Sequence, residues 1–448
     1  MIKVITYGTY DLLHYGHIRL LERAKSLGDY LIVAVTADDF DKVRGKINVQ
    51  QSLTERIEAV RKTGIADEII VEEYEGQKID DIKKYDIDIF TVGSDWLGKF
   101  DYLKEYCDVV YLERTEGISS SEIRNKKREL RLGLVGDSNV LEKFTRESHY
   151  VNGIKIIGIC TDNRYLLKGE LGKLELITDD YIKLLEYVDA VYIISNPQKH
   201  YEHIKTAMLK GKHVLCESPI TVKRSLCKEL FELAKKNDCV LMEALKTAYA
   251  TAYYRLLLLI KSGRIGKVLS VDATCTSIRD IDLNNKLLLR NTWNSICAWG
   301  PTAMLPIFQI LGTEYSNKKI TTKFLDKETK FDSFTKIDFY YADAVASLKV
   351  GKGVKSEGEL IVSGTKGYVY VPAPWWKTDY FEIRYEDPNN NKRYFYQLDG
   401  EGMRYEIVTF ARAIEMRKIN TSITRHVSEA IVGVIEDYYN DDFNCQII

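Results

Sequence analysis

The feature that most constrains this fold is a repeated alternation of short apolar runs with amphipathic stretches. Between residues 2 and 112, the runs IKVITY, YLIVAVT and IDIFTVG alternate with charged stretches whose apolar residues recur every three or four positions. Short apolar runs predict buried strands, and the longer period predicts helices. This rhythm is typical of an α/β fold with a parallel sheet and crossover helices.

The same rhythm begins again after a charged, helix-like stretch from Ser121 to Arg131. The strand-like run LGLVG opens at residue 132, and GIKIIGIC and DAVYII follow. After a helix expected near 249–263, the pattern changes to alternating strands rich in tyrosine and β-branched residues. We therefore predict an N-terminal doubly wound parallel sheet, a second Rossmann-like domain, and an α+β domain with a mostly antiparallel sheet and terminal helices.

The length of the chain supports a division into several domains. A single hydrophobic core stops growing at about 250 to 300 residues, and this chain has 448. We place the three domains at residues 1–128, 131–245 and 246–448.

Charge and cysteine usage exclude several classes of partner. The chain has 64 Lys plus Arg against 65 Asp plus Glu, so no overall field attracts nucleic acid or an anionic membrane. The most apolar helical stretch, Leu256 to Ile260, is far shorter than the roughly 20 residues that span a bilayer. The eight cysteines show no zinc-ligand spacing, so we predict reduced thiols and no protein metal site. The N-terminus lacks the pattern of a signal peptide, and we expect a cytoplasmic protein.

A segment directly after the first predicted strand contains two histidines, His14 and His17. It reads GTYDLLHYGH from Gly8 to His17 and leads into the first predicted helix. Glycine lets backbone N–H groups approach a phosphate, and a helix N-terminus supplies unpaired donors. Two imidazoles three residues apart can both donate to one phosphoryl group during attack. The alternative is that they are ordinary polar residues at a helix start.

A second segment near the end of the predicted domain decides between these alternatives. It runs from Arg114 to Ser121 (RTEGISSS), again between a strand and a helix. Ser119 or Ser120 could simply cap that helix. An arginine, a glycine turn and hydroxyls at a helix start are also what the β- and γ-phosphates of a nucleotide require. The two segments together predict a nucleotide phosphate site.

Both segments resemble the signatures of the glycerol-3-phosphate cytidylyltransferase family, G-T-[FY]-D-x-x-H-x-G-H and R-T-x-G-I-S-[ST]. The resemblance covers about residues 1–128 and includes the stretch 92–101. It implies transfer of CMP from CTP to a polyol phosphate, which gives a CDP-alditol and pyrophosphate for synthesis of a cell-surface polymer such as cell wall or capsule. Glycerol 3-phosphate is the first expected acceptor, ahead of ribitol 5-phosphate and other alditol phosphates. The loop 42–52, about one residue longer than the family pattern, leaves the acceptor open.

The resemblance also implies roles for individual residues. His14, His17, Lys46 and Arg114 would be catalytic, and Arg44, Lys46 and Arg56 would bind the acceptor phosphate. The nucleotide would contact Gly8, Thr9, Tyr10, Asp11, Gly16, Gly93, Asp95, Arg114, Thr115, Gly117, Ile118, Ser119 and Ser120. Mg²⁺ is expected to accompany CTP, held largely by phosphates and water. No general base is needed, because a phosphate monoester is already largely dianionic near neutral pH.

Residues 131–448 resemble the Gfo/Idh/MocA oxidoreductase family, which acts on sugar carbons with NAD(P). The resemblance rests on the stretches 188–193, 211–219 and 263–268. It implies a dinucleotide site near Gly136, Asp162, Asn196, Glu217 and Lys246. Four positions depart from the family pattern: a glycine of the phosphate loop, the lysine of an E-K-P segment, an aspartate and a proton donor are replaced by Ser138, Ser218, Ala298 and Thr302, respectively.

These departures leave three interpretations of the second half. It is a catalytically inactive, structural or oligomerising module, a reductase with rearranged groups that supplies the alditol phosphate, or a module that binds a sugar phosphate or a nucleotide. Lys246 could replace the lost amine, or it could be a surface or interdomain charge. A non-catalytic nucleotide-binding scaffold is the alternative for the whole protein. Both resemblances imply a homodimer or larger assembly.

Overall fold

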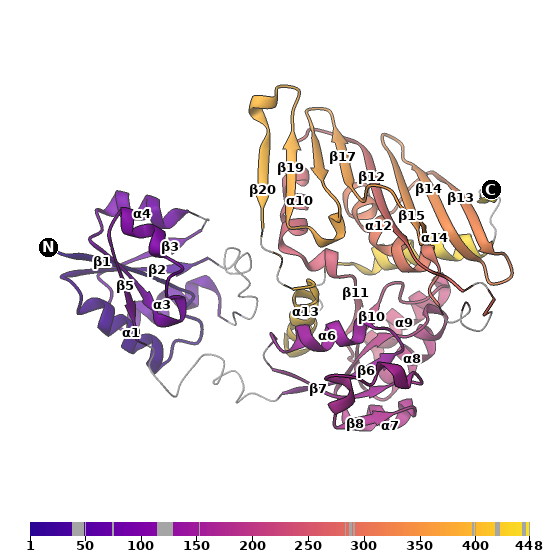
Figure 1. Ribbon diagram of the computed structural model, residues 1–448, viewed down its shortest axis with the longest axis horizontal. Coiled ribbons are helices and arrows are strands. Elements are labelled where there is room, and N and C mark those ends of the chain that lie inside the picture. Colours follow the sequence, from indigo (N-terminus) through magenta and orange to yellow (C-terminus); the bar gives the residue numbers. More distant parts are fainter. Residues whose placement is uncertain are drawn as a thin grey trace. The chain divides into compact units, whose positions relative to one another are not determined.

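The computed structural model describes most of the chain, in two compact units, Met1–Glu129 and Leu130–Ile448 (Figure 1). The described residues are 1–37, 49, 51–73, 76–113, 129–151, 153–282, 284–285, 289, 292–396, 398, 400–416, 422–440 and 445–447. Within these ranges, no helix combines the length and the apolar character needed to cross a bilayer.

The first unit is built on a five-stranded sheet in which every neighbouring pair of strands is parallel. The strand order is β3-β2-β1-β4-β5. The strands are β1 (Lys3–Gly8), β2 (Tyr30–Thr36), β3 (Glu68–Glu72), β4 (Ile89–Gly93) and β5 (Asp108–Leu112). The helices are α1 (Tyr15–Lys25), α3 (Leu53–Lys62) and α4 (Gln77–Tyr85), with short 3-10 turns η1 (Ser94–Trp96) and η2 (Asp101–Glu105).

Hydrophobic side chains cover both faces of this sheet in two separate clusters. Successive residues of β1, such as Val4 and Ile5, belong to different clusters and are fully buried. Successive side chains of a strand point to opposite faces, so a continuous apolar run is needed where both faces carry helices. The doubly wound sheet expected from the apolar runs is confirmed.

The second unit begins with a six-stranded sheet, also parallel throughout, in the order β11-β10-β9-β6-β7-β8. Its strands are β6 (Leu130–Gly136), β7 (Ile154–Cys160), β8 (Leu176–Thr178), β9 (Ala190–Ile194), β10 (His213–Glu217) and β11 (Leu241–Ala244). Its helices are α6 (Val140–Ser148), α7 (Tyr181–Tyr187), α8 (Pro197–Leu209) and α9 (Arg224–Lys236), with 3-10 turns η3 (Arg164–Leu166) and η4 (Leu171–Lys173). The expected second Rossmann-like fold is present.

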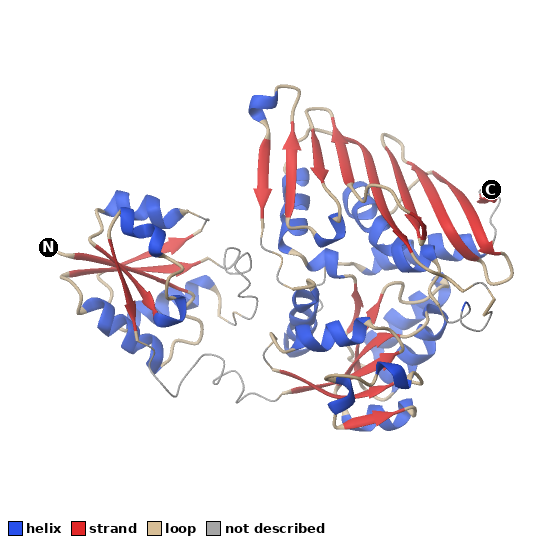
Figure 2. Ribbon diagram, viewed as in Figure 1, coloured by secondary structure: helices blue, strands red, loops and turns tan. Residues whose placement is uncertain are grey.

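A large mixed sheet follows in the same unit, with helices packed on one face (Figure 2). Its strands are β12 (Val268–Ile278), β13 (Asn317–Asp326), β14 (Phe331–Tyr340), β15 (Val345–Gly351), β16 (Gly353–Val354), β17 (Leu360–Gly364), β18 (Tyr368–Val371), β19 (Tyr380–Arg384), β20 (Lys392–Phe395) and β21 (Cys445–Ile447). The helices and turns are η5 (Lys246–Tyr249), α10 (Thr251–Lys261), α12 (Ser295–Leu311), η6 (Trp375–Lys377), η7 (Pro388–Asn390), α13 (Met403–Met416) and α14 (Arg425–Tyr439).

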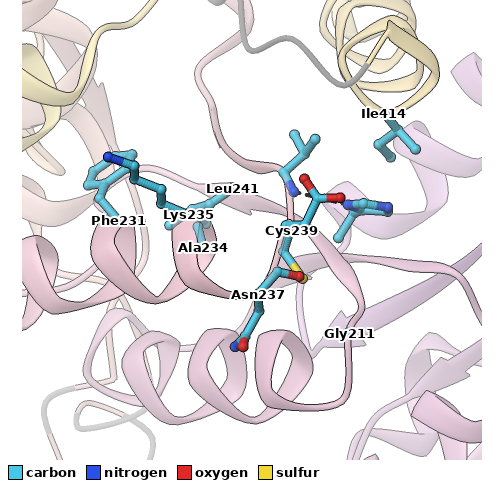
Figure 3. A pocket seen from close by; sticks show the side chains of 11 residues that line it. Gly211, Phe231, Ala234, Lys235, Asn237, Cys239, Leu241 and Ile414 are labelled. Atoms are coloured by element: carbon cyan, nitrogen blue, oxygen red, sulfur yellow. Dashed lines mark hydrogen bonds between the residues drawn. The ribbon is translucent and has the colours of Figure 1, made fainter.

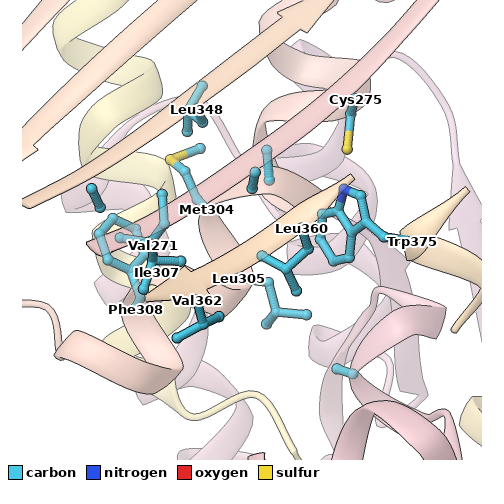
Figure 4. Packing of buried hydrophobic residues seen from close by; sticks show 14 of the residues in the cluster. Val271, Cys275, Met304, Leu305, Ile307, Phe308, Leu348, Leu360, Val362 and Trp375 are labelled. Atoms are coloured by element: carbon cyan, nitrogen blue, oxygen red, sulfur yellow. The ribbon is translucent and has the colours of Figure 1, made fainter. Parts of the chain in front are cut away.

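The core of this part lies between the mixed sheet and α12. Met304, Leu305 and Phe308 of α12 pack against Val271 and Leu348 of the sheet (Figure 4). The pairs β12–β15 and β13–β21 are parallel and the other described pairs are antiparallel, so the mostly antiparallel sheet is confirmed.

Three expectations change in detail. The helix expected near 249–263 is α10 and begins two residues later, at Thr251. The strand expected from residue 132 begins at Leu130, so the end of the predicted charged helix belongs to β6, while residues 121–128 lie outside the described residues. The seven cysteines whose side chains are described are free thiols. The boundary at 245/246 stays a prediction.

Candidate active site

The strand order of the first unit creates a switch point between β1 and β4. The chain runs outward from β1 through β2 to β3 and then crosses to β4 on the other side. In open α/β sheets, ligands bind outside the carboxyl ends of the strands at such a point. Gly8 ends β1 and Gly93 ends β4, and the rest of the histidine segment, Thr9 to His17, directly follows Gly8. The segment and Asp95 of η1 therefore lie at the site that the topology predicts.

The loop between β1 and α1 has a strained backbone. Tyr10 and Leu12 have φ angles of 53° and 47°, a region that non-glycine residues rarely adopt. The buried Tyr10 ring lies against the Cα of Gly8, where an added Cβ would come within 2.9 Å of the ring. Residues held in such conformations cluster at functional sites, because the surrounding structure must fix them in place.

The two histidines lie at the N-terminus of α1 with their rings stacked. The ring centroids of His14 and His17 are 4.0 Å apart and the ring planes differ by 23°. His14 is the N-cap, and its Nδ1 accepts a hydrogen bond from the Gly16 N–H at 3.1 Å. Because Nδ1 accepts, the ring proton lies on Nε2 and can be donated elsewhere. No acidic side chain occupies the first turn of α1, so its positive end is available to an anion.

The side chain of Arg56 in α3 anchors the loop between β1 and α1 through hydrogen bonds. Its side chain is fully buried, and Nη1 donates to the carbonyl oxygens of Thr9 at 2.7 Å and Thr36 at 2.8 Å. Its Nε donates to the carbonyl oxygen of Gln51 at 3.2 Å. In turn, the Gln51 side chain accepts from the Leu12 N–H at 2.7 Å, and Asp11 accepts from the Gln51 N–H at 3.0 Å. The strained loop is thus tied to α3 by a closed hydrogen-bond network.

Replacing Gly8 with alanine is expected to disturb this loop. The new Cβ would force the Tyr10 ring to move, and overpacking of this kind typically costs about 1 to 3 kcal/mol. We expect lower thermal stability of the first unit and lower activity. The control for stability is Gly93→Ala, because that position is open and its φ is −64°, so the thermal stability should change little. Equal activity of Gly8→Ala and the parent protein would contradict the close approach.

In the second unit, Gly136 and Asn196 flank the corresponding switch point between β6 and β9. The Ser138 hydroxyl accepts a hydrogen bond from the Val140 N–H at 3.2 Å, at the start of α6. This donor is one that a Rossmann fold normally offers to the pyrophosphate of a dinucleotide. Asp162 is exposed just beyond β7, a place suited to a ribose hydroxyl. The crevice therefore has the topology of a Rossmann fold, but the Ser138 side chain lies within its phosphate loop.

The carboxyl ends of β10 and β11 carry buried acids instead of an amine. Ser218 donates to one oxygen of the fully buried Glu243 carboxylate, and Ser428 of α14 donates to the other. Burial raises the pKa of Glu243. The Tyr192 hydroxyl donates to Glu217 Oε1 at 2.5 Å, and burial raises the pKa of Glu217 to about 7. The position of the family's lysine is thus used to satisfy a buried carboxylate.

Lys246 lies at the junction of the Rossmann-like part with the mixed-sheet part. Its Nζ is 3.6 Å from Glu401 Oε2, its side chain is 24% exposed, and burial lowers its pKa. It is therefore a partly buried charge at this junction, and its place in a dinucleotide site stays a prediction.

The pH dependence of stability provides a test of the ion pairs of Glu401. Its hydrogen bond with Lys377, with Lys246 and Lys143 nearby, lowers the pKa of Glu401 to about 2. The unfolded chain therefore takes up this proton first as the pH falls, so the stabilisation is present above about pH 5 and is lost towards pH 2. We expect the stability difference between the parent and Glu401→Gln, followed by tryptophan fluorescence in urea, to shrink between pH 7 and 3.5. The exposed pair Lys155–Glu175 supplies the control variant Glu175→Gln.

A cavity of about 580 Å³ lies at the other end of this sheet (Figure 3). Gly211, Cys239 and Leu241 line it near the amino ends of β10 and β11, and Ile414 of α13 closes one side. Ligands of α/β sheets bind at the carboxyl ends of strands, so this cavity is not the expected cofactor site.

Comparison with known proteins assigns the first unit. Residues 5–126 match the cytidylyltransferase-like family. Glycerol-3-phosphate cytidylyltransferases from Bacillus spizizenii and Staphylococcus aureus are 53% identical over 124 residues and 49% identical over 128 residues. Each alignment covers 28% of this chain and 95% of the relative. The chain belongs to the cytidylyltransferase-like family. It is an enzyme, a nucleotidyltransferase, with a second unit that these relatives do not align with.

The second unit of this nucleotidyltransferase has different relatives. Residues 130–245 match the oxidoreductase family with an NAD-binding Rossmann fold. A 3-ketoreductase from Actinomadura kijaniata, solved with NADP and TDP-benzene, has a TM-score of 0.61 at 17% identity, covering 72% of this chain and 99% of the other. A UDP-N-acetylglucosamine 3-dehydrogenase from Acidithiobacillus ferrooxidans has a TM-score of 0.55 at 15% identity, covering 68% and 95%. At this identity, these structures establish the fold of the unit.

The predicted residues of the cytidylyltransferase unit fall into two groups. Those in the described ranges come together at the switch point: Gly8, Thr9, Tyr10, Asp11, His14, Gly16 and His17 beyond β1, and Gly93 and Asp95 beyond β4. Arg44, Lys46, Arg114, Thr115, Gly117, Ile118, Ser119 and Ser120 lie outside the described residues. Their predicted contacts, and that of Arg56 with the acceptor, stay predictions.

Several residues of the two sites carry no sequence motif. Gln51, which joins Asp11 to Arg56, belongs to no signature, and neither do Tyr192, Glu401 and Glu406 of the second unit. The glycines on both sides of Glu401, Gly400 and Gly402, are the one sequence signal that indicates a turn at this position.

Proposed function

We propose that the first unit transfers CMP from CTP to glycerol 3-phosphate and releases pyrophosphate. The observation that carries this proposal is the stacked pair of His14 and His17 on the N-terminus of α1, at the switch point of the sheet. The names of relatives that are about half identical over this unit support glycerol 3-phosphate as the acceptor. The product, CDP-glycerol, is an activated donor for polymer synthesis at the cell surface.

The chemistry is an in-line displacement at phosphorus. A phosphate oxygen of glycerol 3-phosphate forms a new bond to the α-phosphorus of CTP, and the bond from that phosphorus to the bridging oxygen of the β-phosphate breaks. Pyrophosphate leaves with the electron pair. Donors at the start of α1 and the two imidazoles are placed to stabilise the oxygens on which charge grows. His14 contributes through Nε2, because its Nδ1 already accepts from Gly16.

The remaining substrate contacts belong to this proposal. Arg44 and Lys46 would hold the acceptor phosphate, and the segment from Arg114 to Ser120 would hold the nucleotide phosphates. The described residues contain no cluster of three acidic, histidine or cysteine side chains that could bind a metal. Mg²⁺ would come with the triphosphate and neutralise its charge, with the residues at the switch point holding the phosphates, because Mg²⁺ is usually bound through phosphates and water.

The test is pyrophosphate release from CTP with a panel of acceptors. Glycerol 3-phosphate, ribitol 5-phosphate, other alditol phosphates and no acceptor are compared, and the products are identified by mass. We expect CDP-glycerol with glycerol 3-phosphate and the highest kcat/KM for that acceptor. Faster release with another alditol phosphate would overturn the acceptor assignment. CTP binding without release in any mixture would favour the nucleotide-binding scaffold.

We propose further that the second unit does not work as an ordinary NAD(P)-dependent reductase. The groups that the family uses for proton transfer are replaced by Ser218, Ala298 and Thr302, and Ser218 is hydrogen-bonded to the buried Glu243. The Ser138 hydroxyl accepts from the Val140 N–H, the first amide of the helix that would hold the pyrophosphate. The residues present therefore do not fit a dinucleotide in the usual way, and no step is assigned to one.

This second proposal is tested with NADH and NADPH. A ligand that binds only the native state raises the melting temperature, by an amount set by its concentration relative to Kd. We expect no shift at millimolar NADH or NADPH and no oxidation of either with sugar phosphates. A shift together with oxidation would establish the rearranged reductase that makes an alditol phosphate for the first unit.

A further inference from the structure

Three lysines from separate parts of the second unit converge on one carboxylate. Lys377 Nζ is 2.9 Å from Glu401 Oε2, Lys246 Nζ is 3.6 Å from the same oxygen, and Lys143 Nζ is 3.4 Å from Oε1. Lys143 lies in the first turn of α6, Lys246 begins η5 and Lys377 ends η6. Ammonium groups brought together by three distant segments repel one another unless an anion lies between them.

The segment that carries Glu401 is shaped to place its carboxylate there. Gly400 and Gly402 flank it with φ angles of 56° and 80°. A Cβ on Gly400 would collide with Glu147 and Arg404, which form a bidentate ion pair between α6 and α13. This pair anchors α13 beside α6 (Figure 1). The glycines allow the chain to pass close to the pair and turn Glu401 towards the lysines.

The neighbouring acids do not neutralise the lysines. Glu406, one turn into α13, is 1% exposed, and neither of its carboxylate oxygens has a hydrogen-bond partner among the described residues. Burial, with Glu217 nearby, raises the pKa of Glu406 well above its usual range. Among the described ion pairs, Lys143, Lys246 and Lys377 each pair with Glu401 and with no other carboxylate, so three basic side chains share one acidic partner.

We propose that Lys143, Lys246 and Lys377 form a binding site for the phosphate group of a small polyol or sugar phosphate, and that Glu401 occupies it until that ligand binds. A phosphate monoester brings up to two charges and three terminal oxygens, against one charge and two oxygens for the carboxylate. The lysine side chains are 45%, 24% and 37% exposed, so a ligand can reach them. The proposal rests on the second unit not being an ordinary reductase, and it deepens that proposal by naming a ligand class.

This ligand class is that of the acceptor proposed for the first unit. A phosphate monoester that displaces Glu401 also removes a contact that holds the segment before α13 against η5 and η6. Binding would therefore loosen residues 400–402 while α13 stays anchored through Arg404 and Glu147.

The number of binding sites per chain and their affinities are measured by equilibrium dialysis of the full-length protein against labelled glycerol 3-phosphate. We expect two sites per chain, one in each unit. Lys143→Ala with Lys377→Ala should weaken one site about ten-fold or more, because the two lost charged contacts together should contribute at least about 1.4 kcal/mol. Glu401→Gln should tighten the same site several-fold, because the competing charge is gone. Hydrogen exchange should be faster at residues 400–402 when ligand is present.

Controls separate this site from the catalytic one. Lys205→Ala, which removes an exposed lysine paired with Glu229 in the same unit, should change neither site. All these variants should retain the kcat and acceptor KM of cytidylyl transfer. A parent protein without this activity would contradict the proposal for the first unit, and it would leave the binding test of this site intact. Unchanged binding in both the double-lysine variant and Glu401→Gln overturns the proposal. Equal competition by inorganic phosphate, or displacement by NADPH at this site, overturns the polyol or sugar phosphate assignment.

Discussion

Replacing His14 or His17 with alanine is expected to lower the turnover of cytidylyl transfer by about 10² or more. The two rings are stacked at 4.0 Å on the positive end of α1, so each can donate to the phosphoryl group as charge grows during attack. This stabilisation is larger in the transition state than in the bound substrate. We therefore expect kcat to fall and the KM for CTP to change little, measured by pyrophosphate release at saturating acceptor.

The effect of His14→Ala on folding must be separated from its effect on the chemical step, because His14 also caps α1. Loss of an N-cap costs about 1 kcal/mol, which could lower activity through unfolding. Asparagine is a good N-cap, so His14→Asn should restore the stability of the helix without restoring turnover. His149→Ala, an exposed histidine of the second unit, is the matched control and should be as active as the parent protein. Full turnover in both His14→Ala and His17→Ala would reject the assignment.

The amino-acid sequence predicts most of the first unit because its main signals are local. The alternation of apolar runs fixes which segments are strands, and the short motif from Gly8 to His17 lies where a strand meets a helix. The topology then brings the end of β4, with Gly93, to the same crevice. Local periodicity and motif position are thus enough to place His14 and His17 at the candidate site.

The parts that could not be predicted depend on contacts between distant residues. No local pattern indicates that Lys143, Lys246 and Lys377 converge on Glu401, since the four residues are separated by up to 258 positions. The same holds for Ser428, which lies 185 positions from Glu243 and shares that carboxylate with Ser218. Burial raises the pKa of groups such as Glu406, and burial of a polar residue is set by the tertiary fold.

Arg56 shows how such contacts change the interpretation of a residue. The resemblance implied that Arg56 binds the acceptor phosphate, whereas its guanidinium donates to three backbone carbonyl groups and its side chain is fully buried. We therefore propose that Arg56 is a positioning residue. It holds in place the loop that begins at Thr9 and also Gln51, which precedes the N-cap Ser52 of α3. A direct role and a positioning role give different results on mutation.

Replacing Arg56 with methionine, which keeps the aliphatic stem, is expected to destabilise the first unit by about 3 kcal/mol or more. The carbonyl oxygens of Thr9, Thr36 and Gln51 would lose their charged donor, and a buried polar group without a partner costs about 1 to 3 kcal/mol. Hydrogen exchange of the amides in β1 and β2 should become faster, and turnover should fall with an increased KM for CTP.

The control lies five residues further along α3, near the end of the helix. Arg61 has a 59% exposed side chain and pairs only with Glu58 at the surface, among the contacts described for it, so Arg61→Met should change stability by less than about 0.5 kcal/mol. If Arg56 instead contacts the acceptor directly, Arg56→Met would increase only the KM for glycerol 3-phosphate and leave hydrogen exchange and the KM for CTP unchanged. That outcome would replace the positioning role, because loss of the bonds to the three carbonyl oxygens would otherwise disturb the loop and the strands that carry them.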